Sequence, residues 1–324
     1  MNLIVEREKS FEGLEQRIQE LRSRGGADAG AQIQRLESSY EELRREIFGN
    51  LTPWERVNMA RHPRRPLAND YIALFDQFDE LHGDRHFRDD PALVAGFSKL
   101  RGRRLMLIAQ QKGRDVKENI RRNFGMVSPE GYRKASRLMT LASRLRLPIV
   151  TLVDTPGADP GIGSEERAQS EAIAGCLTAL SKAGVPVVAT IIGEGGSGGA
   201  LALALADWVI MPQHSIYSVA SPEGCASILW GDASRAAEAA ERLCLTSNDL
   251  ERFGIVDEVI AEPLGGAHRD TPAFTATVIE EIDAALRRLE VQSPEQLRER
   301  RYEKYRRIGS WQEDARRGIA SAAT

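Results

Sequence analysis

The sequence has little cysteine, no long apolar run and almost no net charge. Its 324 residues include three cysteines, Cys176, Cys225 and Cys244, which stand far apart and form no C-x-x-C pair. This spacing argues against a disulfide framework or a metal site and favours buried thiols in a reducing compartment. Every apolar stretch is broken by glycine, proline or charge well short of a membrane span, and residues 1–20 lack a signal-peptide core. We therefore expect a cytoplasmic protein with no metal on this chain and no membrane contact.

The charged residues are nearly balanced, with 44 Lys and Arg against 47 Asp and Glu and a formal net charge of −3. This balance gives no global reason to expect a nucleic-acid partner. Hydrophobic residues make up 42% of the chain, which is ordinary for a protein that builds a large core. The length allows about two domains, or one large α/β domain with appendages.

Three regions differ in pattern, at residues 1–66, 67–271 and 272–324. In the first, apolar residues recur at helical spacing on both sides of a glycine-rich breaker at 25–30, which predicts a helical hairpin followed by a Pro- and Arg-rich connector. The last region returns to charged amphipathic helix and ends in an arginine-rich tail.

In the middle region, strand-like and helix-like segments alternate, which predicts βαβ units, mostly parallel pairing and an α/β core. We expect strands at 104–109, 149–153, 187–192, 209–211, 216–219 and 256–260. We expect helices at 129–144, 164–182, 198–206, 223–230 and 233–243.

A glycine cluster follows the apolar strand that ends at Ile192. Its members are Gly193, Gly195, Gly196, Gly198 and Gly199, and a helix of small and apolar residues comes directly after it. Glycine lets another molecule approach the main chain without a Cβ in the way. Unpaired amides and the dipole at a helix N-terminus both favour negative charge. The cluster therefore predicts a site for a resident or developing anion.

A second loop, at residues 154–164, follows the strand expected at 149–153 and contains two prolines and three glycines. It indicates a rigid, exposed turn ahead of a helix that Ser164 caps. Because the carboxyl ends of parallel strands lie on one side of a sheet, this loop and the glycine cluster can converge. Two converging sets of amide donors would form an oxyanion hole.

Two other interpretations fit the glycine cluster less well. Residues 193–198 match the dinucleotide-binding pattern G-x-G-x-x-G, but residues 214–218 lack the acidic side chain which that site needs. The pattern G-x-S-x-G around Ser197 matches a hydrolase nucleophile, for which Asp257 and His268 are the pair in suitable order. Nothing in the sequence places His268 near Ser197.

Several long motifs together resemble one family, the carboxyltransferase α subunit of bacterial acetyl-CoA carboxylase. They are DTPGA at 154–158, EER at 165–167, QSEAIA at 169–174, IGEGGSGGAL at 192–201, SPEGCASILW at 221–230 and EPLGGAHR at 262–269, with QKGR at 111–114 and RRNFGM at 121–126 upstream. The resemblance covers nearly the whole chain. It implies a crotonase-like fold of the ClpP/crotonase type, a spiral of ββα units, with the helical hairpin before it and helices after it.

The resemblance also implies an activity and partners. A carboxyl group would pass from carboxybiotin, carried covalently by a biotin carboxyl carrier protein, to acetyl-CoA to give malonyl-CoA. A separate β subunit with a zinc ribbon would share the reaction in an α2β2 assembly, and biotin carboxylase would supply the carboxybiotin. The alternatives are a self-sufficient crotonase-fold acyl-CoA hydrolase or hydratase, and a scaffold paralogue without turnover.

Within this interpretation, backbone amides stabilise the charge that develops on biotin, so that no side-chain base is needed. We assign the catalytic amides to Gly198, Gly199 and Ala200. We expect the biotin end to be bound by Gly157, Ala158, Gly195, Gly196 and Ser197.

Two features of the sequence leave alternatives open. Asp159 stands where the family usually has an aromatic residue, and a carboxylate beside an anion site is unfavourable unless it points outward or is paired. A basic run could meet CoA phosphates or the carrier, or could be a solvated, salt-bridged surface. Its members are Lys112, Arg114, Lys117, Arg121 and Arg122.

Overall fold

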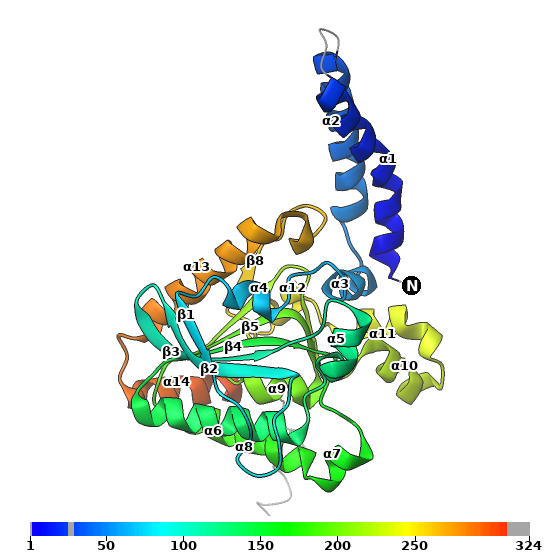
Figure 1. The fold of residues 1–324 in the computed structure, drawn as a ribbon. Coiled ribbons are helices and arrows are strands. Elements are labelled where there is room, and N and C mark those ends of the chain that lie inside the picture. The colour runs from blue at the N-terminus through cyan, green and yellow to red at the C-terminus, as the bar shows by residue number, and fades with distance from the viewer. Residues whose placement is uncertain (1, 25–28, 310–324) are drawn as a thin grey trace, which may run out of the picture.

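A computed structural model describes residues 2–24 and 29–309 of the chain. The chain begins with two antiparallel helices, α1 (Leu3–Arg24) and α2 (Ala29–Phe48), which stand out from the body of the molecule (Figure 1). At their base a hydrophobic cluster joins the helices to the body through Ile4, Phe11, Phe48, Leu51 and Met59. The expected helical hairpin is therefore confirmed, and its buried apolar side chains extend from the base out to Ile18 on α1.

The connector from the hairpin to the sheet contains two short helices, α3 (Pro53–Ala60) and α4 (Ala68–Ile72). Thr52 and Glu55 form a capping box at the start of α3, in which each side chain accepts the other residue's backbone N–H. This box satisfies two backbone amides at the start of α3 that would otherwise lack an acceptor.

An eight-stranded sheet forms the centre of the body, with seven strands in the order β1-β2-β3-β4-β5-β6-β8 and β7 paired to the end of β5. Pairing is parallel from β3 onward and antiparallel among the first three strands. The mostly parallel α/β core is thus confirmed. The strands are β1 (Gln77–Glu80), β2 (Leu93–Leu100), β3 (Arg103–Gln110), β4 (Ile149–Thr155), β5 (Val187–Gly196), β6 (Trp208–Pro212), β7 (Ile216–Ser218) and β8 (Glu258–Ile260).

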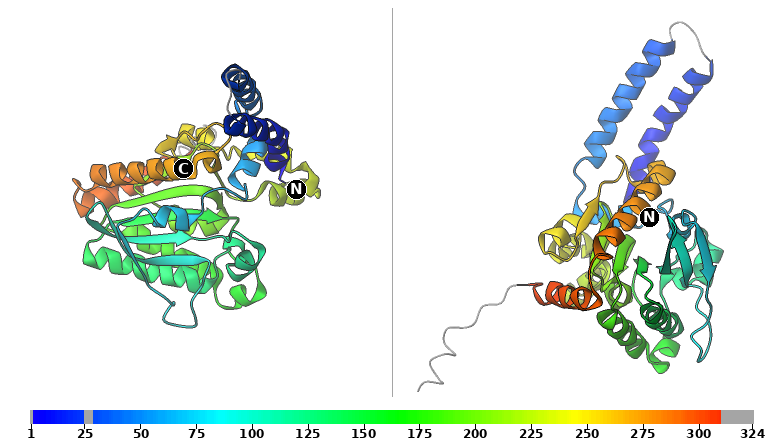
Figure 2. Two further views of the ribbon diagram at one scale, coloured as in Figure 1. Left: turned by 45° about the horizontal axis from the view of Figure 1, so that its top comes forward. Right: turned by 90° about the vertical axis from the view of Figure 1, so that its left-hand side faces the viewer.

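Both faces of the sheet are buried, so successive residues of a strand enter two different hydrophobic cores. On β3, for example, Met106 and Ile108 belong to one core, and Leu105 and Leu107 belong to the other. The first core lies under α6 (Pro129–Leu145), α8 (Gln169–Lys182) and α9 (Ser197–Ala204). The second lies under α4 and α13 (Thr271–Leu289). Figures 1 and 2 show these two helical layers on opposite sides of the sheet.

The remaining helices connect the strands or cover the edges of the body. They are α5 (Val116–Arg121), α7 (Ile162–Glu166), α10 (Pro222–Trp230), α11 (Ala236–Leu243), α12 (Ser247–Arg252) and α14 (Pro294–Arg306), with short 3-10 turns at Asn123–Gly125, Ala233–Arg235 and Ala267–Asp270. No helix in the described part of the chain is long and apolar enough to cross a membrane. The division at residues 66 and 271 stays a prediction, although α13 packs directly onto the sheet.

Three details of the expected secondary structure were wrong. One helix was expected at 164–182, but the chain forms α7 and α8 there, because Ala168 has a left-handed backbone (φ 63°) that ends one helix and starts the next. Ser164 lies inside α7 rather than at its cap, and its hydroxyl donates to Asp159. Strands β1 and β2 were not expected. The first is short and polar, and the second is apolar on both faces without alternation.

Candidate active site

The glycine cluster lies at the end of β5 and the start of α9. Gly193, Gly195 and Gly196 are the buried last part of the strand, and the helix begins at Ser197, whose backbone is left-handed (φ 53°). The pairing of β4 with β5 shifts here, since Val153 lies opposite Ile191 but Thr155 lies opposite Gly195. The two extra residues of β5 form a bulge, which carries the start of α9 past the end of β4.

The loop after β4 packs directly against this turn. A Cβ added to Gly199 would lie 2.6 Å from the amide nitrogen of Ala158, and one added to Gly196 would lie 2.1 Å from the carbonyl oxygen of Pro156. Real side chains do not approach so closely, so both positions need glycine because main chain meets main chain. The structure therefore brings together the two loops that the sequence suggested could converge.

Backbone amides at this junction have no acceptor outside their own helix. This holds for Gly198, Gly199 and Ala200 within residues 2–24 and 29–309. In the facing loop, the amide of Gly157 donates to Thr155 Oγ1 at 3.1 Å, so Ala158 carries the unpaired amide there. The arrangement can hold negative charge between the helix terminus and this loop.

Gln110 holds the two loops at a fixed separation. Its side chain is fully buried at the end of β3, where Nε2 donates to the carbonyl of Gly199 (2.8 Å) and Oε1 accepts the amide of Asp154 (3.1 Å). One amide group is thus bonded to the start of α9 and to the loop after β4. Sequence reasoning missed Gln110. The signal was its position as the last residue of a strand beside β4.

A group of charges, which we call the site cluster, lies beside the same loops and consists of Arg61, Lys112, Asp154 and Glu194. Its two carboxylates are buried and its two cations are half-buried. Lys112 Nζ lies 2.7 Å from Asp154 Oδ1 and 3.3 Å from Glu194 Oε2, and Arg61 Nη2 lies 2.6 Å from Glu194 Oε1. Asp154 Oδ1 also accepts the backbone N–H of Glu194 at 3.0 Å. The cluster therefore joins the loop after β4 to the bulged end of β5 through the backbone as well as through charge.

The electrostatics of the site cluster favour the fully charged state. Burial lowers the pKa of Lys112, but the charges of Asp154 and Glu194 outweigh burial and hold that pKa above its usual value. Burial raises the pKa of Glu194, and the charges of Lys112 and Arg61 reverse this and bring it below its usual value. Arg61 also contacts Glu223 at 2.6 Å, which ties the start of α10 to the cluster.

An apolar hollow of about 460 Å³ opens beside Ser197 and Gly198. Burial raises the pKa of Tyr217, one of the side chains in its wall. A ligand in this hollow would have its polar end beside the first turn of α9 and its apolar part against side chains. Besides Tyr217, the apolar side chains that line the hollow are Leu201, Val219, Leu243, Leu250, Phe253, Ile255 and Ile308.

Asp159 does not direct its charge toward the helix terminus. Its carboxylate accepts the amide of Gly161 at 3.2 Å and the hydroxyl of Ser164 at 2.5 Å, so it stabilises its own loop. This turn explains how a carboxylate is tolerated next to an anion site. Ser221 caps α10, since its hydroxyl accepts the amide of Gly224 at 3.0 Å and Pro222 is the first helical residue.

The basic run is divided between two environments. Lys112 belongs to the site cluster, Arg114 is paired with Asp70, and Arg122 is paired with Glu118 at 2.9 Å. These three positions fit the salt-bridged interpretation. The other two, Lys117 and Arg121, are exposed on α5 and have no ion pair in the described part of the chain, so a role toward CoA or the carrier stays a prediction for them.

The three cysteines are all free. Cys176 is buried as expected, whereas Cys225 and Cys244 are half-buried.

The triad that a hydrolase would need is not formed. Nε2 of His268 lies 2.6 Å from Glu8 Oε1, at the base of the hairpin, and Asp257 accepts the backbone N–H of Val209 at 2.7 Å. Both candidate partners of Ser197 are therefore held by other groups. The dinucleotide interpretation also fails, because the first glycines lie inside a paired strand instead of forming a loop.

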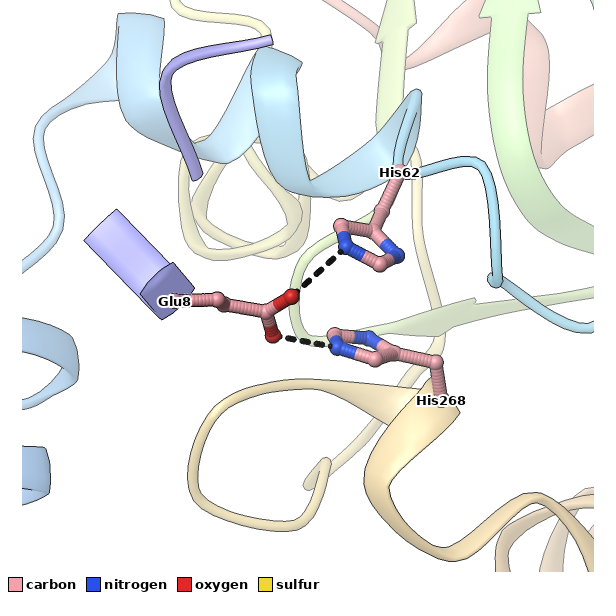
Figure 3. Close-up of side chains that lie close together, drawn as sticks. All are labelled: Glu8, His62 and His268. Atoms are coloured by element: carbon pink, nitrogen blue, oxygen red, sulfur yellow. Dashed lines mark hydrogen bonds and ion pairs between the residues drawn. The ribbon is translucent and has the colours of Figure 1, made fainter. Parts of the chain in front are cut away.

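Glu8 is the buried centre of a second group of charges, the hairpin cluster, formed with His62, Arg64, His268 and Arg269, of which Arg64 is exposed. Figure 3 shows both imidazoles pointing at the Glu8 carboxylate, and their rings are stacked with centroids 3.7 Å apart. Nε2 of His62 lies 3.1 Å from Glu8 Oε2. The two arginines contact the same carboxylate at 2.7 and 3.0 Å. Burial raises the pKa of Glu8, and the hydrogen bonds from both histidines outweigh it and place the pKa well below the usual range.

In the described part of the chain, Glu8, His62 and His268 are the one group of three side chains close enough to share a metal ion. Their chemistry does not fit one. Nδ1 of His62 accepts the backbone N–H of Arg64 at 3.2 Å, so the neutral ring carries its proton on Nε2, the atom that would have to bind the metal. Two guanidinium groups on the same carboxylate also oppose a cation. The cluster is a salt bridge that fastens the hairpin.

Comparison with known proteins identifies the class of protein first. Transcarboxylase 12S, with methylmalonyl-coenzyme A bound, superposes with a TM-score of 0.56 at 22% identity over 69% of this chain and 41% of that one. The Pseudomonas malonate decarboxylase MdcD–MdcE heterodimer gives a TM-score of 0.54 at 18% identity over 72% and 92%. At these identities the likeness shows the fold alone, and that fold is crotonase-like.

The particular family follows from sequence. Residues 4–309 match the family described as acetyl co-enzyme A carboxylase carboxyltransferase-like. The acetyl-coenzyme A carboxylase carboxyl transferase subunit alpha of Pseudomonas savastanoi pv. phaseolicola is 52% identical over 93% of this chain and 97% of its own length. The same subunit of Pseudomonas aeruginosa is 51% identical over 94% and 97%. The chain belongs to this carboxyltransferase family, which confirms the resemblance found in its motifs.

Proposed function

We propose that the chain is the α subunit of an acetyl-CoA carboxylase carboxyltransferase and that it works with a separate β subunit. In the reaction, carboxybiotin on a carrier protein supplies an activated carboxyl group, which acetyl-CoA receives to become malonyl-CoA. Family membership and the names of the relatives support this assignment. The zinc ribbon of the β subunit, the carrier protein and biotin carboxylase remain expectations from the resemblance.

One observation supports the chemical part of the proposal. The amides of Gly198, Gly199 and Ala200 have no acceptor outside their own helix, and the main chain of this turn meets the loop that carries the unpaired amide of Ala158. Their N–H groups would donate to the oxygen on which negative charge develops as the carboxyl group leaves. Since these donors are fixed before the reaction, they need no reorganisation, and removing one such donor typically costs about 3 kcal/mol of barrier.

The other residues bind, orient and exclude water. The apolar hollow beside Ser197 and Gly198 would take the apolar part of the biotin end and keep solvent from the amides. Gln110 and the site cluster would maintain the separation of the two loops. In this proposal no side chain of the protein acts as a base. A proton from the acetyl methyl group would instead leave to the charged oxygen that the amides stabilise.

The test is to add one methyl group where the two loops touch. Gly199→Ala would place its Cβ 2.6 Å from the amide of Ala158, so the loops must separate, whereas Gly175→Ala adds the same methyl on α8 with its nearest atom at 3.6 Å. We expect malonyl-CoA formation by the reconstituted α and β subunits to fall by about 100-fold or more in the first variant. The control is expected to keep its rate.

Circular dichroism and elution volume check that both variants fold. A folded Gly199→Ala subunit with undiminished transfer would disprove the role of these amides. Failure of the wild-type chain to support transfer with any β subunit would disprove the assignment of function, and hydrolysis of acyl-CoA by the chain alone would favour the hydrolase.

A further inference from the structure

A second hollow, of about 1100 Å³, lies on the outer side of α6 and α8 and shares no lining residue with the apolar hollow of the candidate active site. We call it the arginine hollow. Besides the two helices, the loop after β1 contributes to its wall. Its five arginines are Arg85, Arg133, Arg137, Arg144 and Arg167.

Two of these arginines are neutralised by buried carboxylates. Arg133 lies 2.9 Å from Asp84 and 3.0 Å from Glu130, and Arg167 lies 2.7 Å from Glu130. Glu130 is fully buried, and the hydrogen bond and charge of Arg167 hold its pKa below the usual value against burial, which acts to raise it. The negative charges of Asp84 and Glu130 are therefore already compensated, and these ion pairs hold Arg133 and Arg167 in place.

The other three arginines have no ion pair within residues 2–24 and 29–309. Arg137 donates through Nη2 to the carbonyl of Gly83 at 3.0 Å, while its Nε is buried without a hydrogen-bond partner. Burial and the charge of Arg85 lower the pKa of Arg137. Glu171 is the remaining carboxylate in the wall and is exposed on α8. Like charges held together around an unpaired buried donor are the arrangement that an anion would stabilise.

The position of Arg85 is fixed by its neighbour. Asp84 Oδ1 accepts the amides of His86, Phe87 and Arg88 at 2.9, 2.8 and 3.1 Å, and this turn holds Arg85 in the left-handed region (φ 69°). A non-glycine residue adopts that conformation at a cost, which the three hydrogen bonds offset. Arg85 is therefore kept at the rim of the hollow by a rigid loop.

The number of unpaired arginines indicates the class of ligand. Arg137 and Arg144 lie on one face of α6, about 10 Å apart along its axis at 1.5 Å per residue, and Arg85 stands at the rim. Three guanidinium groups that each take two oxygens need more oxygens than one phosphate group has, whereas two or three linked phosphates supply them. Guanidinium groups bind phosphate with two parallel hydrogen bonds. Leu141 and Ala172 add an apolar surface on which an organic group can rest.

We propose that the arginine hollow binds a small anion with two or more phosphate groups, at a site separate from carboxyl transfer. The inference goes beyond the proposed function and does not depend on it. The test uses the full-length chain, titrated calorimetrically with inorganic tripolyphosphate, with metal-free ATP and with inorganic phosphate at constant ionic strength. Tripolyphosphate and ATP distinguish a purely inorganic ligand from one whose organic part uses the apolar surface.

We expect saturable one-to-one binding of tripolyphosphate or ATP, with phosphate at least tenfold weaker. Arg85→Glu/Arg144→Glu should weaken binding at least tenfold, because both side chains are exposed and unpaired at the rim. The control Arg45→Glu/Arg104→Glu makes the same change of charge at two exposed arginines outside the hollow and should bind as the wild type does. Equal loss in both double variants, or no saturable binding by the folded chain, would overturn the proposal. Binding of an acidic peptide or RNA that tripolyphosphate cannot displace would overturn it as well.

Discussion

The site cluster and the hairpin cluster are built alike but are connected to the backbone differently. In each, cations surround a buried carboxylate. In the site cluster, Asp154 also accepts the backbone N–H of Glu194, so the ion pairs and the path of β5 depend on each other. In the hairpin cluster, Glu8 contacts side chains alone, from the connector and from the turn before α13. The comparison teaches that one cluster shapes a strand end while the other attaches a separate element.

Removing a cation from the site cluster gives the largest effect we expect. Lys112→Met leaves the charges of Asp154 and Glu194 buried and poorly compensated, which should lower the free energy of unfolding by about 3–5 kcal/mol and reduce carboxyl transfer. The control is Arg114→Met, two residues after Lys112. It breaks an exposed ion pair with Asp70 and should lower the free energy of unfolding by at most about 1 kcal/mol. Urea unfolding of both variants measures the difference. Equal losses would contradict the distinction between buried and exposed pairs.

A third buried group, His214 with Arg65 and Glu262, extends the comparison, because we expect it to make the free energy of unfolding depend on pH. Nδ1 of His214 lies 3.1 Å from Arg56, and burial, only partly opposed by Glu262, lowers its pKa from 6.5 to about 4. The unfolded chain therefore binds a proton first as the pH falls. Stability from this group is complete above pH 6.5 and is lost progressively down to about pH 4, by about 3 kcal/mol.

The pH experiment compares the wild type with His214→Gln by urea unfolding at pH 7.0, 5.5 and 4.5. The wild type should lose more stability than the variant over this range, because the variant has no imidazole to protonate at position 214. Parallel curves for the two proteins would show that the neutral imidazole contributes nothing to the pH dependence.

The smallest effect is expected at the hairpin. Glu8→Gln keeps the shape of the side chain but removes the charge that His62, His268 and two arginines contact, so the free energy of unfolding should fall by about 1–2 kcal/mol. Hydrogen exchange should accelerate in α1 and leave β5 unchanged. Glu20→Gln, which loses an exposed pair with Arg17 on the same helix, is the control. Faster exchange in β5 would show that the two clusters are not independent.

The sequence was most informative where chemistry depends on the local chain. Gly196 and Gly199 stood out in the sequence as part of a glycine cluster at a helix start, where another molecule could approach the main chain. The structure adds that both positions also need glycine because two backbones meet there. The hairpin followed from helical periodicity, and most strands followed from short apolar segments. The break at Ala168 did not, since alanine favours helix and the left-handed turn is imposed by the surrounding structure.

Contacts between distant parts of the chain could not be read from any motif. Arg61 and Glu194 are 133 residues apart, and Gln110 reaches Gly199 across 89 residues. Each of these polar side chains looks ordinary in its own segment of the sequence. It becomes important for stability only because folding buries it next to its partner. Glu8 and His268, which are 260 residues apart, show the same limit at the hairpin. The pairing of β1 escaped prediction because a polar edge strand has no apolar face to reveal it.

Strand β5 extends beyond the end of β6. This affects how slowly the backbone amides at the end of β5 exchange their protons with water. Val188, Ala189 and Thr190 pair with β6, while Glu194, Gly195 and Gly196 pair with β7, so two short strands follow each other along the same edge. The last residues before the helix are therefore flanked on both sides, by β4 and by β7. A position that looks like the end of a loop in the sequence is instead enclosed like the middle of a sheet, which keeps solvent from loosening it during turnover.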